Sequence, residues 1–302
     1  MAQLNHTQQL ARTEEALTVL FCLIDDAYAT LNPNGRRYEP LKRLSDSEII
    51  TLALLQQLRG VESERSFLRD TQRFFSHLFP GVVRLHPSSF HRRVRKLRRF
   101  LEPLRREIVP ELVGDPETLL VDSTLLAALH PRQVPQSAGF PGATWVRWGS
   151  FSVYGVKLHI LCATNGVPLS YELTPANVAE VRLTEELIAG ANLRDDLARR
   201  LFGDLAYRSE ALGHALAECG ISLVTERADQ HGKRQRIEIA LSSLKRVFGL
   251  GWTLATTLVG LATRIAAKIC ATPTPFTSTG CWVALKDASR NCGRKPDNRH
   301  LG

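Results

Sequence analysis

The sequence has no closely spaced cysteine pair, no uninterrupted apolar run long enough to cross a bilayer, and only 7% aromatic residues. Scattered cysteines in a chain of this length are typical of free thiols in a reducing cytoplasm, and they argue against a thiolate zinc site. The most apolar stretch, Thr253–Ala271, carries Arg264 and Lys268 four residues apart, so it predicts an amphipathic helix rather than a membrane span. The N-terminal residues lack a basic start followed by an apolar core, so no secretory signal is expected. The cysteines are Cys22, Cys162, Cys219, Cys270, Cys281 and Cys292.

Acidic residues are outnumbered by basic ones, 30 against 39, which gives a formal net charge of +9 and a pI near 9.5. Such a balance favours a polyanionic partner, either a nucleic acid or an anionic membrane surface. With 44% apolar and 23% charged residues, the composition excludes wholesale disorder and collagen-like structure. A length of 302 residues is enough for two ordinary domains or one large one.

Residues 1–115 have helical periodicity. We expect helices at Ala16–Leu31, from the capping-box pair Ser45 and Glu48 up to Gly60, and at about Glu64–Leu78. A fourth helix is expected to start at Pro87, because apolar residues then recur every three or four positions as far as Ile108. Its polar face consists mostly of arginine, and Pro103 is expected to kink or split it.

From Glu117 the pattern changes to short strands and helices. Thr118–Leu126 predicts a strand with Asp122 inside it, Pro131–Ser150 predicts a loop, and Asn165-Gly166 predicts a hairpin turn between two further strands. A mixed α/β sheet with helices on both faces follows, and the tail beyond Cys270 has no period. The remaining expected elements are the hairpin strands Phe151–Thr164 and Val167–Leu173, helices at Val181–Ala191 and Ser209–Cys219, short strands at Arg200–Gly203 and Ile221–Thr225, and a helical region at Arg236–Ala271 broken at Gly249–Gly251.

Three acids stand at the ends or in the middle of these elements. Asp122 lies within an apolar strand, where an uncompensated carboxylate is costly. Asp204 follows a short strand, at the edge where α/β sheets bind ligands, and Glu238 lies in the first turn of the final helix. Taken singly, Asp204 also fits a cap or a turn residue, and Glu238 fits a helix-start residue favoured by the macrodipole.

If the first and fourth strands are neighbours, Asp122 and Asp204 face each other, and a packed helix can bring in Glu238. Three converging carboxylates repel one another, and divalent cations with a preference for hard oxygen ligands relieve that repulsion. Two Mg²⁺ or Mn²⁺ ions at such a site can activate a water or a 3′-hydroxyl and stabilise the leaving oxygen of a phosphodiester.

Five ordered blocks of the chain, within residues 119–271, carry a resemblance to a known family. In these blocks the sequence resembles the DDE transposases of bacterial insertion sequences, which have an RNase H-like catalytic domain, and Leu44–Ile50 is similar to their helical leader. The blocks are Val121-Asp122-Ser123-Thr124, Tyr154-Gly155-Val156-Lys157-Leu158-His159, Leu173-Thr174-Pro175-Ala176-Asn177-Val178, Phe202-Gly203-Asp204-Leu205-Ala206-Tyr207 and Arg236-Ile237-Glu238.

The resemblance implies a metal-binding catalytic triad of Asp122, Asp204 and Glu238. Many relatives carry a Tyr-Arg-Glu-Lys signature around the last acid; Arg234 and Lys245 keep its spacing, and Lys245 is expected to reach a phosphate. The chain departs from the family in three places. His231 stands where the tyrosine would be, Leu205-Ala206 replaces the usual Lys-Gly after the second acid, and residues 272–302 lack the basic helical ending, which a frameshift would explain.

Two groups of residues are candidate DNA contacts. The arginine-rich helix can lie along a phosphate backbone or enter a major groove, and its alternative role is a solvated basic face. Aromatic side chains beside Arg147 can stack on unpaired bases or serve as buried anchors, and Lys157 can line the site or mark a solvent edge. The candidates are Arg92, Arg93, Arg95, Lys96, Arg98, Arg99, Trp145, Arg147, Trp148, Lys157, Arg234 and Lys245.

The interpretation is a helical DNA-binding domain at residues 1–115, an RNase H-like DDE catalytic domain at 116–271 and an irregular tail at 272–302. The resemblance implies an enzyme that binds terminal inverted repeats, cuts DNA with Mg²⁺ or Mn²⁺ and transfers the strand to target DNA, as a DNA-bound homodimer in the cytoplasm at the bacterial nucleoid. Two alternatives remain: an RNase H-like nuclease without strand transfer, and a catalytically inactive DNA-binding derivative.

Overall fold

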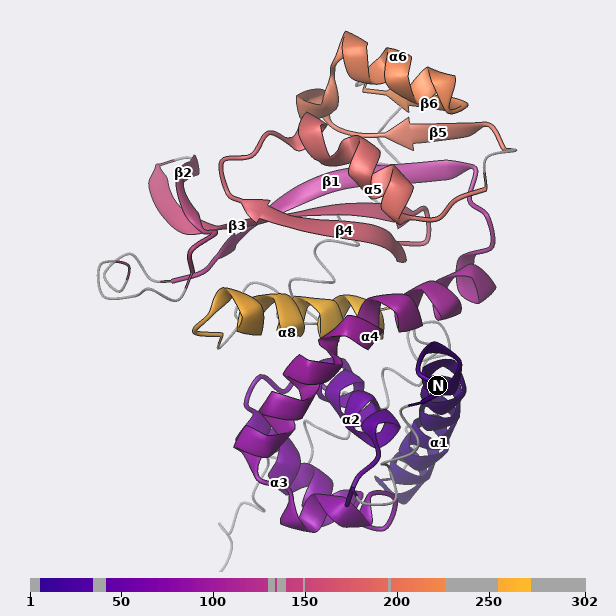
Figure 1. The fold of residues 1–302 in the computed structure, drawn as a ribbon, viewed down its shortest axis with the longest axis vertical. Coiled ribbons are helices and arrows are strands. Elements are labelled where there is room, and N and C mark those ends of the chain that lie inside the picture. Colours follow the sequence, from indigo (N-terminus) through magenta and orange to yellow (C-terminus); the bar gives the residue numbers. More distant parts are fainter. Residues whose placement is uncertain are drawn as a thin grey trace, which may run out of the picture. The chain divides into compact units, whose positions relative to one another are not determined.

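The computed structural model describes residues 6–34, 42–129, 134, 140–148, 150–194, 197–225 and 255–272 (Figure 1). The chain divides into two compact units, and the boundary falls between Leu104 and Arg105. It lies one residue after Pro103, inside the long helix α4 (Pro87–Val113), which continues through the proline. The predicted split at Pro103 is therefore wrong, because a proline removes only one backbone N–H donor and the neighbouring turns stay intact, whereas the predicted alternative of a kink stays a prediction.

The first unit is helical. It contains α1 (His6–Leu31), α2 (Asp46–Leu58), α3 (Glu64–Phe74), the 3₁₀ turn η2 (Pro80–Arg84) and the start of α4. The predicted capping box begins α2: the Ser45 hydroxyl accepts from the Glu48 N–H over 3.0 Å, and the Glu48 carboxylate accepts from the Ser45 N–H. Gly60 follows the end of α2 with φ 63°, a left-handed conformation that glycine adopts without steric cost.

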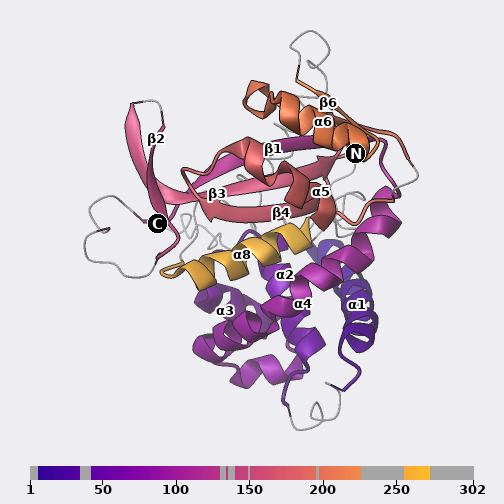
Figure 2. The same cartoon turned by 45° about the horizontal axis from the view of Figure 1, so that its top comes forward.

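The second unit is built on a six-stranded mixed sheet (Figure 2). Its strands are β1 (Thr118–Ala127), β2 (Thr144–Trp148), β3 (Phe151–Ala163), β4 (Pro168–Pro175), β5 (Arg199–Phe202) and β6 (Ile221–Val224). Strands β4, β3 and β1 form an antiparallel meander, whereas β5 runs parallel to β1 and β6 parallel to β5. The order β4-β3-β1-β5-β6 is that of an RNase H-like sheet, and β2 adds a short ribbon to the first half of β3.

Strand β2 was not expected, because residues 131–150 predict a loop from their polar, Pro- and Gly-containing composition. The segment Thr144–Trp148 pairs antiparallel with residues 151–155 of β3, and so the loop prediction is wrong for these five residues. Tryptophan and valine favour pleated structure, and the cross-strand contact of Trp145 with Tyr154, with ring centroids 5.4 Å apart, contributes to the pairing. The predicted hairpin is confirmed: Gly166 has φ 82° in the turn between β3 and β4.

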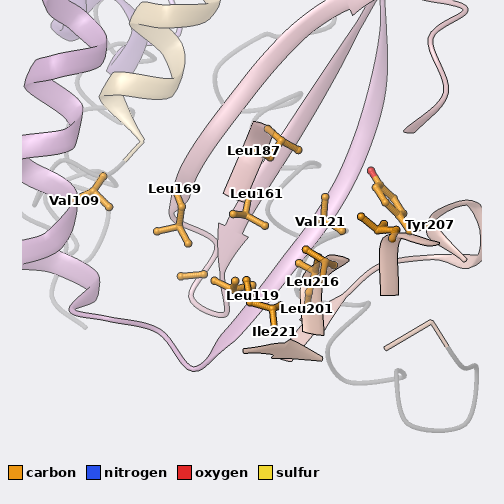
Figure 3. Packing of buried hydrophobic residues seen from close by; sticks show 12 residues of the cluster. Val109, Leu119, Val121, Leu161, Leu169, Leu187, Leu201, Tyr207, Leu216 and Ile221 are labelled. Atoms are coloured by element: carbon orange, nitrogen blue, oxygen red, sulfur yellow. The ribbon is translucent and has the colours of Figure 1, made fainter. Parts of the chain in front are cut away.

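Helices cover the sheet. The 3₁₀ turn η4 (Glu180–Leu183) leads into α5 (Thr184–Gly190), the turn η5 (Leu205–Tyr207) follows β5, and α6 (Glu210–Glu218) lies between β5 and β6. Leu187 of α5 and Leu216 of α6 belong to one buried cluster with Leu119 and Val121 of β1, so both helices cover the same face of the sheet (Figure 3). Helix α8 (Leu258–Ala271) confirms the end of the predicted final helix, and its first residue packs beside Gly142.

Candidate active site

The pairing of β1 with β5 brings the strand that carries Asp122 beside the strand that precedes Asp204. The two strands are parallel, with Leu119 opposite Leu201 and Leu120 opposite Phe202. Asp122 lies two residues after Leu120 within β1, and Asp204 lies two residues after Phe202, where β5 ends. The predicted pairing of the first and fourth expected strands is confirmed.

Backbone N–H groups hold both carboxylates. The Ser123 N–H donates to Asp122 Oδ1 over 2.7 Å, and the Ala206 N–H donates to Asp204 Oδ1 over 2.9 Å. Asp204 therefore caps η5 at the point where β5 has ended, which directs the chain into a turn directly after the acid. Both side chains are half-buried, so each carboxylate keeps some access to solvent while its position is restrained.

The negative charge of Asp122 contributes to the raised pKa of two buried groups, Cys162 and Tyr207. Burial, with Asp122 as the next contribution, raises the pKa of the Cys162 thiol on β3 to about 12. Burial also raises the pKa of Tyr207, and the carboxylates of Asp122, Glu180 and Asp204 raise it further. The hydroxyl of Tyr207 therefore stays protonated at any physiological pH.

Glu180 is a third acid of this region that sequence reasoning missed. Its Oε1 accepts from the Ser123 hydroxyl over 2.7 Å and lies 3.4 Å from Lys157 Nζ. It stands in η4, which packs against η5 behind Asp204. Acidic residues are common just before a helix, where they interact favourably with the helix macrodipole. In the sequence, Glu180 therefore has no distinctive signal other than its position shortly after the Asn177-Val178 segment.

Lys157, a predicted DNA contact, is turned into the protein. Its ammonium donates to the Val178 carbonyl over 3.0 Å and pairs with Glu180, and its side chain is 15% exposed. His159, two residues along the same strand, is completely buried and its Nε2 lies 2.9 Å from the hydroxyl of Thr174. Burial and the charge of Lys157 lower the pKa of His159 to about 4, so the imidazole is neutral at physiological pH.

The carboxylate oxygens of Asp122 and Asp204 are ligands of the type that hard divalent cations prefer. Within the ranges that the structure describes, no three His, Cys, Asp or Glu side chains come together as a metal site. Glu238, the predicted third ligand, lies outside the described residues, as do Arg234, His231, Lys245 and the tail from residue 273.

The arginine-rich face of α4 is exposed on the side opposite its buried residues. Phe90, Leu97 and Leu101 are buried, and five basic side chains are exposed. Arg93 differs from them, because its guanidinium pairs with Asp46 over 2.6 Å and also donates to the Ser45 carbonyl. Burial alone would raise the pKa of Asp46, but hydrogen bonds from Lys42 and Arg93 outweigh it and lower the pKa. The exposed basic residues are Arg92, Arg95, Lys96, Arg98 and Arg99.

The β2 ribbon presents two further candidates to solvent. Trp145 is 48% exposed although its ring contacts Tyr154, and Arg147, two residues on, is also exposed. Residues two apart in a strand share a face, so the indole and the guanidinium lie on the same side of the ribbon. Trp148 ends β2, and its side chain lies outside the description.

The order of the strands, with one acid inside β1 and another just after the parallel strand β5, defines the second unit as an RNase H-like α/β domain. The family model of the transposase DDE domain matches residues 114–272, which is more than half of the chain. The chain therefore belongs to the DDE transposase family, a class of metal-dependent enzymes of DNA transposition.

Solved structures that resemble the chain are also transposases. A piggyBac transposase synaptic complex with hairpin DNA has a TM-score of 0.45 at 12% identity. The matched region covers 94% of this chain and 82% of the piggyBac chain. A pre-cleavage Mos1 transpososome has a TM-score of 0.26 at 12% identity, with 85% and 81% covered. Because both scores are below 0.5, the family assignment depends on the family model alone. No curated protein matches the chain. None of the helices in the described ranges has the length and hydropathy to cross a membrane.

Proposed function

We propose that the protein is the DNA transposase of a bacterial insertion sequence, which binds the terminal inverted repeats of its element and catalyses metal-dependent strand cleavage and strand transfer. The observation that carries this proposal is the parallel register of β1 with β5, which supports a position of Asp204 near Asp122 inside the region that matches the transposase DDE domain. Such an enzyme would work at the nucleoid in the bacterial cytoplasm.

Asp122, Asp204 and Glu238 are the residues that would hold two Mg²⁺ or Mn²⁺ ions. When bound, such ions activate the attacking oxygen and stabilise the leaving oxygen of a phosphodiester. The chain contributes fixed carboxylates, since the Ser123 and Ala206 N–H groups restrain Asp122 and Asp204. Carboxylates that are already restrained lose less conformational freedom when they bind a cation, which favours a defined site.

DNA would be held by residues of both units. In the first unit the exposed basic residues of α4 would contact phosphates. In the second, Trp145 and Arg147 on the β2 ribbon would stack on or contact unpaired bases near a cut end. Trp148, Arg234 and Lys245 belong to the same proposal. Lys157 and Arg93 would act indirectly, because their charged groups are bound to Glu180 and Asp46. Two ends must be joined in one event, so the DNA-bound form would be a homodimer.

The proposal is tested with a labelled duplex that carries the terminal repeat of the element, incubated with Mn²⁺ and a target plasmid. Asp122→Asn and Asp204→Asn keep the size of each side chain, and each should reduce cleavage by at least about 100-fold. Glu218→Gln, which neutralises an exposed acid of α6, is the matched control and should cut like the wild type.

Cleavage followed by joining supports the transposase. Cleavage without joining would instead identify an RNase H-like nuclease, and binding without cleavage an inactive DNA-binding derivative; either result would overturn the proposal. Equal cleavage by the wild type and the two Asp→Asn variants would show that the acidic pair is not the catalytic centre.

A further inference from the structure

Helix α3 presents a row of three arginines to solvent. Arg65, Arg69 and Arg73 are all exposed, and they follow one another at intervals of four residues. Residues four apart share one face of a helix and are about 6 Å apart along its axis, so the row is about 12 Å long. Phe67, Leu68 and Thr71 are buried on the opposite side, which fixes the row as the outward face.

The positive charge of this row is not neutralised by its neighbours. The nearby acids of α3 are committed elsewhere: Glu64 Oε1 lies 3.0 Å from His91 Nδ1, and Asp70 lies 3.8 Å from the buried guanidinium of Arg59. Among the described residues, Arg65 and Arg69 have no ion-pair or hydrogen-bond partner, and Arg73 contacts only the ring of Phe74, 5.3 Å from its centroid.

The helix that carries the row is held firmly within the first unit. The Ser63 hydroxyl caps its start by accepting from the Ser66 N–H, and Gln72 Nε2 donates to the Val82 carbonyl over 3.0 Å. The rings of Phe67 and Phe90 lie 6.1 Å apart, which joins α3 to the first turn of α4. The three guanidinium groups therefore project from a fixed backbone, which lowers the entropy cost of binding an extended partner.

We infer that Arg65, Arg69 and Arg73, named here the α3 row, form a second surface of the first unit that binds the phosphate backbone of duplex DNA, separate from the basic face of α4. Arginine is the side chain best suited to phosphate, because its planar guanidinium donates two parallel hydrogen bonds. A step of about 6 Å between side chains matches about two base-pair steps of 3.4 Å, so each arginine can meet its own phosphate. The inference rests on the proposed function, since it takes terminal DNA as the partner.

The test measures DNA affinity as a function of salt, with no divalent cation present so that binding is separated from cleavage. Fluorescence anisotropy of the labelled terminal duplex would be recorded from 50 to 300 mM KCl for the full chain. The variant Arg65→Gln/Arg69→Gln/Arg73→Gln should bind more weakly, and the slope of log K against log salt should become shallower by about 2.7, because each lost phosphate contact removes about 0.9. The single change Arg69→Gln should remove about 0.9.

The control removes the same charge in the second unit, by Arg182→Gln/Arg194→Gln/Arg200→Gln, all at exposed positions. It should leave the salt slope within about 0.5 of the wild-type value. Thermal unfolding followed by circular dichroism would verify that the variants are folded, as expected for exposed side chains.

Three outcomes would overturn the inference. If the wild type binds and the α3-row variant keeps its slope, the row is a solvated face only. If the control loses as much slope as the variant, the effect is one of total charge. If the wild type fails to bind any duplex, the proposed function fails together with this inference, and that result is distinct from the first two.

Discussion

The hydroxyl of Ser123 donates to Glu180 Oε1 over 2.7 Å, and this bond connects the residue after Asp122 to the turn that packs behind Asp204. Glu180 also lies 3.4 Å from the ammonium of Lys157, so one carboxylate joins β1, β3 and η4. Ser123, Glu180 and Lys157 therefore form a polar base that begins at the residue next to Asp122 and reaches η4, the turn that packs against η5.

A double-mutant cycle measures how strongly that base is coupled. Ser123→Ala and Glu180→Ala should each lower the free energy of unfolding by about 1–2 kcal/mol, because each removes a part-buried hydrogen bond and Glu180→Ala leaves Lys157 without its counter-ion. The double variant should lose about 1 kcal/mol less than the sum of the two. Urea unfolding supplies the four values, and strict additivity would show that the 2.7 Å contact carries no coupling.

Glycine at position 155 is required by the close approach of β3 to β1. A Cβ on Gly155 would lie 2.1 Å from the carbonyl oxygen of Leu126, so Gly155→Ala must push the two strands apart. We expect a loss of about 1–3 kcal/mol in the free energy of unfolding. Gly213→Ala is the matched control: it lies in α6 with nothing within 4 Å of its Cβ, and it should stabilise the protein by about 0.5–1 kcal/mol. Equal effects at both positions would contradict the steric explanation.

Arg105 satisfies two backbone carbonyls inside the second unit. Its side chain is buried, and it donates to the carbonyls of Pro168 and Leu169, each over 2.7 Å. Arg105→Met would remove a charged donor from both carbonyls at the start of β4, and we expect it to cost about 2–4 kcal/mol in denaturant unfolding. Arg98→Met, at an exposed position of the same helix, should change stability by less than about 0.5 kcal/mol. A small cost for Arg105→Met would mean that water replaces the guanidinium.

The neutral imidazole of His159 should make stability depend on pH. Its pKa is about 4 in the folded protein against an ordinary value of 6.5, so the unfolded chain takes up the proton first as the pH falls. The neutral imidazole therefore contributes stability that is fully present above about pH 6.5 and is lost as the pH falls to 4. Down to pH 4.5, this loss in the free energy of unfolding is at most about 2.5 kcal/mol.

Urea unfolding at pH 7.5 and 4.5 would compare the wild type with His159→Gln, which keeps a polar group toward Thr174. The variant should lose less stability on acidification than the wild type. A loss of the same size in both proteins would show that His159 is not the source of the acid sensitivity.

Local signals in the sequence determined most of the elements. The capping box at Ser45, the Asn165-Gly166 turn and the apolar run around Asp122 each depend on a few neighbouring residues, and each predicts an element that the structure contains. The strand at Thr144–Trp148 was missed because its stability comes from pairing with β3, and composition alone does not report a pairing partner.

The sequence by itself determined which acids to suspect and that the chain carries an excess of positive charge, because residue types and spacing are local information. Only the tertiary structure decided that β1 lies beside β5 in a parallel register. It also decided that Glu180 binds Ser123 and Lys157, that Arg93 pairs with Asp46, and that none of the described residues forms an ion pair with the α3 row. The physical reason is that pairing, burial and charge neutralisation are made between residues far apart in the chain, and their free energies depend on distances that no local pattern contains.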